Sequence, residues 1–206
     1  RVSRGGAQVA FGVQPDLSSF AKIVAGGLPG AAVAGRRDIL ELLDFAAAEK
    51  SGREKIQHPG TFNANPVSAA AGTAALTLIA ETNACDEASR AAAVLRDELN
   101  AVLEQERVPW AIYGTYSGFH TFMNTQGRAL RPSRFDPTKF GMEELKAQPK
   151  TLVNRMRLAL LVHGVDVGSR IGGFLSATHT ADDIEHTVDA FRQSVRMLKQ
   201  EGELPA

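Results

Sequence analysis

This sequence has little cysteine and few aromatic residues, and neither sign of charge is in excess. Its 206 residues include one cysteine, Cys85, one tryptophan and two tyrosines. A single cysteine forms no internal disulfide, and the five histidines lack the paired spacing of a zinc site. Lys plus Arg equals Asp plus Glu at 23 each, so no basic surface predicts nucleic-acid binding, and the aromatic residues are too few for base stacking.

Long hydrophobic runs are missing as well. The longest uncharged run, 56–80, contains His, Pro, Asn, Gly and Thr and is too polar to span a membrane. Residues 1–6 are polar, and no apolar stretch of signal-peptide length follows them. The glycines at 26, 27 and 30 lack the Lys-Ser/Thr of a P-loop, and no Gly-x-Ser-x-Gly elbow occurs. We therefore expect a cytoplasmic protein that binds neither membrane nor nucleic acid.

Hydrophobic residues make up 44% of the sequence, which is enough to form one large core or two small ones. Residues 1–19 are predicted to be irregular, and 46–55 a polar, mobile loop. The predicted strands are 20–24 (or a tight turn there), 31–35, 108–113, 118–123, 165–167 and 174–175. The predicted helices are 37–45, 67–81 behind an Asn65–Pro66 start, 87–106, 142–163 broken at Pro149, and one capped by Thr180–Asp183.

The segment Pro15–Pro29 carries the first chemical signal. It places Lys22 between a short apolar run and the glycine pair Gly26–Gly27, where a backbone can approach a ligand closely. In an apolar setting the ammonium form is disfavoured, so the free amine becomes available for Schiff-base chemistry. A solvated lysine beside a glycine turn is the alternative interpretation.

The segment His58–Pro66 carries the second signal, a tight turn with the hydroxyl of Thr61 at its centre. Backbone N–H groups at such a turn, together with a hydroxyl donor, suit a phosphate oxygen. Taken alone, Thr61 is equally an ordinary turn residue.

Taken together, these segments resemble the class III (fold type I) pyridoxal-phosphate aminotransferases, within them the glutamate-1-semialdehyde aminomutase branch. The order Pro15–Leu17, Lys22, Gly26–Gly27 and Gly35–Asp38 carries the resemblance. It implies that Lys22 holds pyridoxal 5'-phosphate as a Schiff base and shuttles the substrate proton. It also implies that Gly60 and Thr61 reach the cofactor phosphate of a neighbouring subunit, in a homodimer with composite active sites.

The segment Ser169–Thr180 resembles the C-terminal signature of the aminomutase branch. The aminomutases usually carry Phe-Glu where this chain has Arg170–Ile171. An arginine at this position could bind a substrate carboxylate through two hydrogen bonds, as an amino-acid aminotransferase requires. A surface arginine in a loop is the alternative. His179 is assigned no chemistry.

The resemblance predicts an α/β fold: 1–82 as the C-terminal part of a large cofactor-binding domain and 83–206 as a small α+β domain. A glycine-rich turn, a stacked aromatic and an aspartate for the cofactor are expected upstream of Arg1, so the chain is expected to be the C-terminal half of a longer enzyme. The predicted activity is amino transfer between an amino acid or amine and a keto or aldehyde acceptor. The alternatives are the aminomutase, which moves an amino group within one molecule, and an inert dimerisation module.

Overall fold

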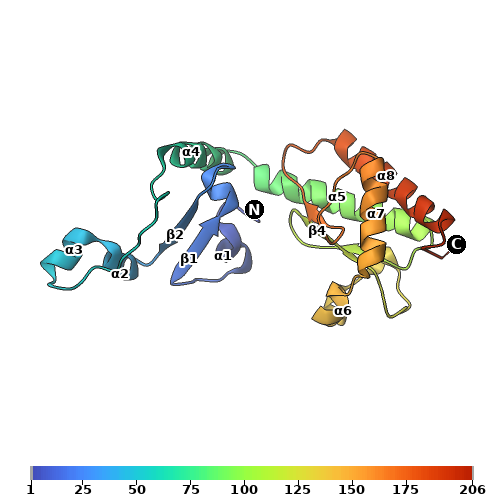
Figure 1. Ribbon diagram of the computed structural model, residues 1–206, viewed down its shortest axis with the longest axis horizontal. Coiled ribbons are helices and arrows are strands. Elements are labelled where there is room, and N and C mark those ends of the chain that lie inside the picture. The colour runs from blue at the N-terminus through green and yellow to red at the C-terminus, as the bar shows by residue number, and fades with distance from the viewer. Residues whose placement is uncertain (1, 206) are drawn as a thin grey trace. The chain divides into compact units, whose positions relative to one another are not determined.

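The computed structural model describes residues 2–205, and the chain separates into two units, one ending at Asn83 and the other beginning at Ala84 (Figure 1). The helices and strands of the N-terminal unit are α1 (Gly6–Phe11), β1 (Leu17–Ala21), β2 (Ala31–Gly35), α2 (Arg37–Leu40), α3 (Phe45–Lys50) and α4 (Pro66–Glu81). Two short 3-10 turns, η1 (Lys22–Ala25) and η2 (Glu41–Leu43), complete it.

In the N-terminal unit, β1 and β2 form an antiparallel pair in which Leu17 faces Gly35 and Ala21 faces Ala31. The strand predicted at 31–35 forms, but its residues are exposed, so the expectation of a buried strand there was wrong. The predicted start of α4 is confirmed. The side chain of Asn65 accepts hydrogen bonds from the N–H groups of Val67 (3.1 Å) and Ser68 (3.0 Å), and Pro66 takes the first helical position. These contacts satisfy backbone donors that a helix N-terminus leaves unpaired.

Two glycines allow η1 to lie directly against α4. A Cβ on Gly72 of α4 would come within 2.4 Å of the Val24 carbonyl oxygen. A Cβ on Gly26, which has φ +62°, would come within 2.3 Å of the Ala71 carbonyl oxygen. Only glycine permits this approach from both sides, so the turn that follows β1 is held at a fixed place on the helix.

Three further predictions for this unit were wrong. Residues 1–19 are not irregular throughout, because α1 forms there and β1 begins at Leu17. Residues 46–50 are helical rather than part of a loop, because Asp44 caps α3 by accepting from the Ala47 N–H at 2.9 Å. The same cap splits the predicted helix 37–45, since Asp44 has the extended backbone of an N-cap residue.

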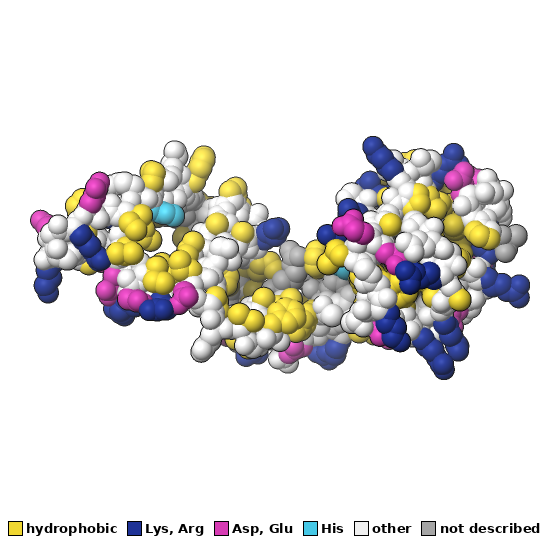
Figure 2. Space-filling model, turned by 90° about the horizontal axis from the view of Figure 1, so that it is seen from below, with side chains coloured by type: hydrophobic (Ala, Val, Ile, Leu, Met, Phe, Trp, Pro, Cys, Tyr) yellow, Lys and Arg dark blue, Asp and Glu magenta, His cyan; other side chains and the backbone are white. Residues whose placement is uncertain are grey.

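The N-terminal unit buries little of its apolar surface. Ala25, Ala48 and Gly72 are its buried residues within the described range, whereas Phe62 is 81% exposed. The other large hydrophobic side chains exposed on this unit include Val9, Phe11, Val13, Phe45, Val67 and Leu78. Apolar side chains are visible across its surface in Figure 2, and an apolar surface of this kind marks a place where another surface binds.

The C-terminal unit is an α+β arrangement with a substantial core. Its elements are α5 (Ala84–Gln105), β3 (Ala111–Tyr113), β4 (Gly118–Phe122), α6 (Met142–Lys146), α7 (Lys150–Val162), β5 (Gly173–Phe174) and α8 (Ala181–Gln200), with 3-10 turns η3 (Pro132–Arg134) and η4 (Pro137–Lys139). The three strands form an antiparallel sheet in the order β3-β4-β5. Helix α8 packs against α5 and α7, and α5 packs against β3 and β4.

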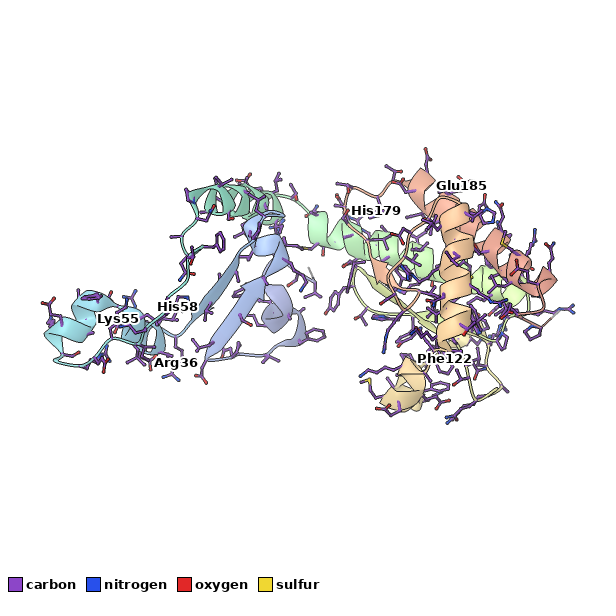
Figure 3. The ribbon with its side chains drawn as sticks, viewed as in Figure 1. Arg36, Lys55, His58, Phe122, His179 and Glu185 are labelled. Atoms are coloured by element: carbon purple, nitrogen blue, oxygen red, sulfur yellow. The ribbon has the colours of Figure 1, made fainter. Side chains whose placement is uncertain are left out.

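The sheet of this unit has side chains packed on both faces. Phe119 and Met123 enter the helical core with Trp110 and Leu99. On the opposite face lies Phe122, which Figure 3 labels. Its ring stacks on Phe135 with centroids 4.8 Å apart, and the ring of Phe140 lies 5.0 Å from that of Phe122. The long excursion 124–140 is therefore fastened to the sheet by aromatic contacts.

Most of the helix boundaries predicted for this unit were correct. The break at Pro149 is confirmed because α6 ends at Lys146 and α7 begins at Lys150. Thr180 and Asp183 form a complete capping box at the start of α8. The predicted strand 165–167 was wrong: these residues are not paired in the sheet, and the Val167 carbonyl accepts instead from Arg157 Nε at 3.2 Å. Among residues 2–205, no helix is long and apolar enough to cross a membrane.

Glu104 on α5 predicts an acid-sensitive contact. Hydrogen bonds from the hydroxyl and the N–H of Ser133, and then from Arg131, lower the pKa of its carboxyl from 4.5 to about 2. Because the folded pKa is depressed, the contact stabilises the fold above pH 4.5 and is lost as the pH falls towards 2. We expect the thermal stability of Glu104→Gln to converge with that of the unsubstituted protein over this window, while the control Glu98→Gln shows no such convergence.

Candidate functional site

Lys22 stands at the junction where β1 ends and η1 begins. Its backbone has φ +58°, a left-handed conformation that is costly for a residue with a Cβ. The strain is maintained because the following turn is fixed against α4 by Gly26 and Gly72. Strained backbone of this kind concentrates at functional sites, and no motif in the sequence indicates it.

The surroundings of Lys22 differ from the expectation. The residue is exposed, so the apolar setting predicted from the sequence is not supplied by the described residues. Its neighbours Ala21, Gly26 and Gly27 are too small to shield an amine from water. The Nζ atom forms no hydrogen bond or ion pair with any residue in 2–205, so no side chain or carbonyl among them competes with a ligand for it.

An open cavity of about 1050 Å³ lies beside this junction, wholly within the N-terminal unit. Small-molecule sites reach volumes of this order. Its lining is largely small and apolar, with polar groups from Ser19, His58, Asn63, Asn65 and Ser68. Figure 3 labels His58 on the extended segment that joins α3 to α4.

The predicted residues border this cavity through their neighbours in the chain. Ala21 and Val24 line it on either side of Lys22, and Pro59 and Phe62 line it on either side of Gly60–Thr61. Lys22, Gly60 and Thr61 themselves do not form its wall. The two segments that the sequence singled out are thus brought to one cavity.

The turn that contains Thr61 is held from within. The Gly60 carbonyl accepts from the Asn63 N–H at 3.0 Å, and the Asn63 side chain donates to the His58 carbonyl at 2.9 Å. Ala64, at φ +57°, is a second strained position on the cavity wall. The N–H and hydroxyl of Thr61 have no acceptor within the described part of the chain, so both remain available to an anion.

Arg170 belongs to the C-terminal unit, in the turn before β5. It is exposed, and its guanidinium donates to no residue in the range 2–205. Burial raises the pKa of Tyr113, and the charge of Arg170 opposes that rise, so the two side chains lie within electrostatic reach of each other. The guanidinium is free to bind an anionic group.

Several polar groups of the site were missed by the sequence analysis. Ser19, His58 and Asn63 line the cavity without any motif that marks them. Asn65 and Ser68 carried a signal, the predicted helix start, but it indicated capping rather than a place in a site. The Ser68 hydroxyl also donates to the Pro29 carbonyl at 2.8 Å, which ties the glycine turn to α4. His179 has a structural contact: its Nδ1 accepts from the Ser176 N–H at 3.0 Å.

Residues 2–126 match the family model described as aminotransferase class-III. The chain belongs to this family. The recognition made from the sequence is confirmed, and so is the α/β class of the fold. The division into a large-domain part and a small domain stays a prediction.

One curated protein and two solved structures are similar to this chain. It is 32% identical over 198 residues to the glutamate-1-semialdehyde 2,1-aminomutase of Laribacter hongkongensis (strain HLHK9), covering 94% of this chain and 42% of that protein. An omega-transaminase from Sphaerobacter thermophilus is 31% identical with a TM-score of 0.74, covering 95% of this chain and 41% of that one. A transaminase solved with PLP bound has a TM-score of 0.76 at 24% identity, over 98% and 43% of the two chains, and shows the same fold. The chain thus spans about 42% of the curated relatives' length.

Proposed function

We propose that this chain is part of a pyridoxal 5'-phosphate-dependent aminotransferase in which Lys22 carries the cofactor. The observation that supports this most is the placement of an unpaired lysine amine on strained backbone beside a cavity. Membership of the class-III family supplies the reaction class. The substrates are an amino acid or amine and a keto or aldehyde acceptor.

The residues present fit the cofactor chemically. The free Nζ of Lys22 is the amine that attaches it, and the unpaired N–H and hydroxyl of Thr61 are donors for its phosphate. When bound, pyridoxal phosphate supplies an aldehyde that condenses with amines and a ring that accepts electrons. Lys22 would then remove the proton from the substrate Cα and deliver it to the cofactor side of the C–N bond, and the fixed turn after β1 would keep its amine in place.

Arg170 is proposed to bind the carboxylate of the amino-acid substrate. A guanidinium presents two parallel N–H donors that match a carboxylate, and this one has no competing acceptor within residues 2–205. An arginine here favours a second, separate amino-acid substrate over the intramolecular reaction, because the aminomutase branch carries Phe-Glu at this place.

A homodimer with shared active sites is part of the proposal. Large apolar side chains such as Phe62 and Val67 are exposed next to the Gly60–Thr61 turn. Covering them with a second subunit removes apolar surface from water and would bring that turn towards the partner's cofactor.

Amino transfer by the full-length protein tests this function. The protein loaded with pyridoxal phosphate is incubated with an amino acid and a keto acid, and the new amino acid is measured. We expect product only when both substrates are present. Isomerisation of glutamate-1-semialdehyde without an external acceptor would establish the aminomutase instead. If neither reaction is detected, the inert dimerisation module is the remaining alternative.

A further inference from the structure

The turn that carries Arg170 is fixed from two sides by residues of other elements. Gln148 stands between α6 and α7, immediately before Pro149, which biases its backbone towards an extended conformation. Its Nε2 donates to the Thr121 carbonyl of β4 at 2.7 Å and to the Arg170 carbonyl at 2.9 Å. One side-chain amide therefore couples the centre of the sheet to the backbone of Arg170.

Ile171, the residue after Arg170, is also held in place by contacts with the sheet. Ile171 is 1% exposed, and its carbonyl accepts from the buried Thr121 hydroxyl at 2.6 Å. Its φ is +48°, a conformation that a β-branched residue adopts rarely and only where its surroundings impose it. The turn closes on itself through the Ile171 N–H to the Gly168 carbonyl and the Gly168 N–H to the Gly172 carbonyl, each at 3.0 Å.

The backbone of Arg170 is thus constrained while its guanidinium is not. The side chain is exposed and donates no hydrogen bond to any residue between 2 and 205. Two of the charged or aromatic neighbours of this turn, Tyr113 and His120, stand opposite each other on β3 and β4 with rings 5.5 Å apart. A rigid turn that holds a free cation is partly preorganised for an anion, since the backbone is already fixed and only the Arg170 side chain remains to be ordered on binding.

We infer that Gln148 and Thr121 are positioning residues for the carboxylate selectivity of this protein, acting through the backbone of Arg170–Ile171. The inference rests on the proposed role of Arg170 and extends it to two residues that touch no substrate. It assigns the strain at Ile171 a purpose, because a relaxed turn would present the guanidinium over a range of positions.

The test compares a carboxylate ligand with its uncharged counterpart in the full-length protein loaded with pyridoxal phosphate. The KM is measured for the amino acid that serves as donor, and the inhibition constant for the carboxamide of the same amino acid. In Gln148→Met, which keeps the volume and removes both donated hydrogen bonds, we expect the KM to rise about tenfold, with kcat within about twofold. The inhibition constant of the carboxamide is expected to stay unchanged.

A second pair of variants distinguishes the loss of one hydrogen bond from a general loss of folding. Thr121→Val removes the hydroxyl that holds Ile171 and should raise the same KM. Thr121→Ser keeps the hydroxyl, and its KM should equal that of the unsubstituted protein. Gln193→Met on α8 is the matched control, because Gln193 is exposed and forms no side-chain hydrogen bond within the described chain.

The outcomes separate the inference from the function on which it rests. If Arg170→Ala raises the KM while Gln148→Met and Thr121→Val do not, Arg170 keeps its role and the positioning inference is wrong. If Arg170→Ala leaves the KM unchanged, the role of Arg170 fails and the inference fails with it. If Gln148→Met raises the KM of the amino acid and the inhibition constant of the carboxamide equally, Gln148 only supports the fold and the inference is overturned.

Discussion

Replacing Lys22 with Ala is expected to reduce amino transfer about 10³-fold or more, because proton transfer by a positioned side chain contributes about 10²–10⁴-fold and attachment of the cofactor is lost as well. Alanine keeps the Cβ and therefore the same cost at φ +58°, so the backbone turn is not relieved. The initial rate of amino transfer by the full-length protein measures the effect.

The control for this substitution is Lys50→Ala, at the exposed end of α3, where the lysine forms no ion pair within the described residues. Its rate should equal that of the unsubstituted protein. Adding a small primary amine to Lys22→Ala should restore part of the rate, because the amine replaces the missing Nζ as proton carrier. Full activity of Lys22→Ala without any added amine would remove this residue from the chemistry.

Replacing Gly72 with Ala is expected to destabilise the N-terminal unit by about 2 kcal/mol, although alanine is the better helix former by about 1 kcal/mol. The added Cβ would lie 2.4 Å from the Val24 carbonyl oxygen. The obstructing atom is backbone rather than the end of a flexible side chain, so α4 and η1 must separate. Since η1 begins at Lys22, the affinity for pyridoxal phosphate should fall together with the free energy of unfolding.

Thr77→Ala, on an exposed position of the same helix, is the matched control for Gly72→Ala. It gains helix propensity without an overlap and should leave the unfolding midpoint equal or slightly higher. Chemical denaturation of both variants, followed by far-UV circular dichroism, gives the comparison. Equal midpoints for the two variants would contradict this prediction, because they would mean that α4 and η1 accommodate the added Cβ without a loss in the free energy of unfolding.

The sequence predicted the elements whose cause is local. The start of α4 follows from Asn65 and Pro66, the break between α6 and α7 from Pro149, and the start of α8 from the Thr180–Asp183 box. Each depends on residues within one helical turn, so a pattern of four letters carries the whole signal. Helix α3 was missed because its cap, Asp44, lies inside an apolar run that resembles one continuous helix.

The arrangement around the site depends on distant parts of the chain and was beyond reach of the sequence. The strain at Lys22 is imposed by the contact of Gly26 and Gly72 with residues about fifty positions away. The bond from Gln148 to Arg170 joins a loop to a turn that no periodicity connects. Motif order indicated Lys22, Thr61 and Arg170, whereas the cavity, the exposure of Lys22 and the fixed turn at Ile171 required the fold.

The attachment of pyridoxal phosphate to Lys22 is the central claim, and one measurement addresses it directly. The full-length protein is loaded with pyridoxal phosphate, reduced with borohydride and digested, and the modified peptide is identified by mass spectrometry. We expect a pyridoxyl group on Lys22 and on no other lysine of this chain. A modification on a different lysine, or none on any, would contradict the account.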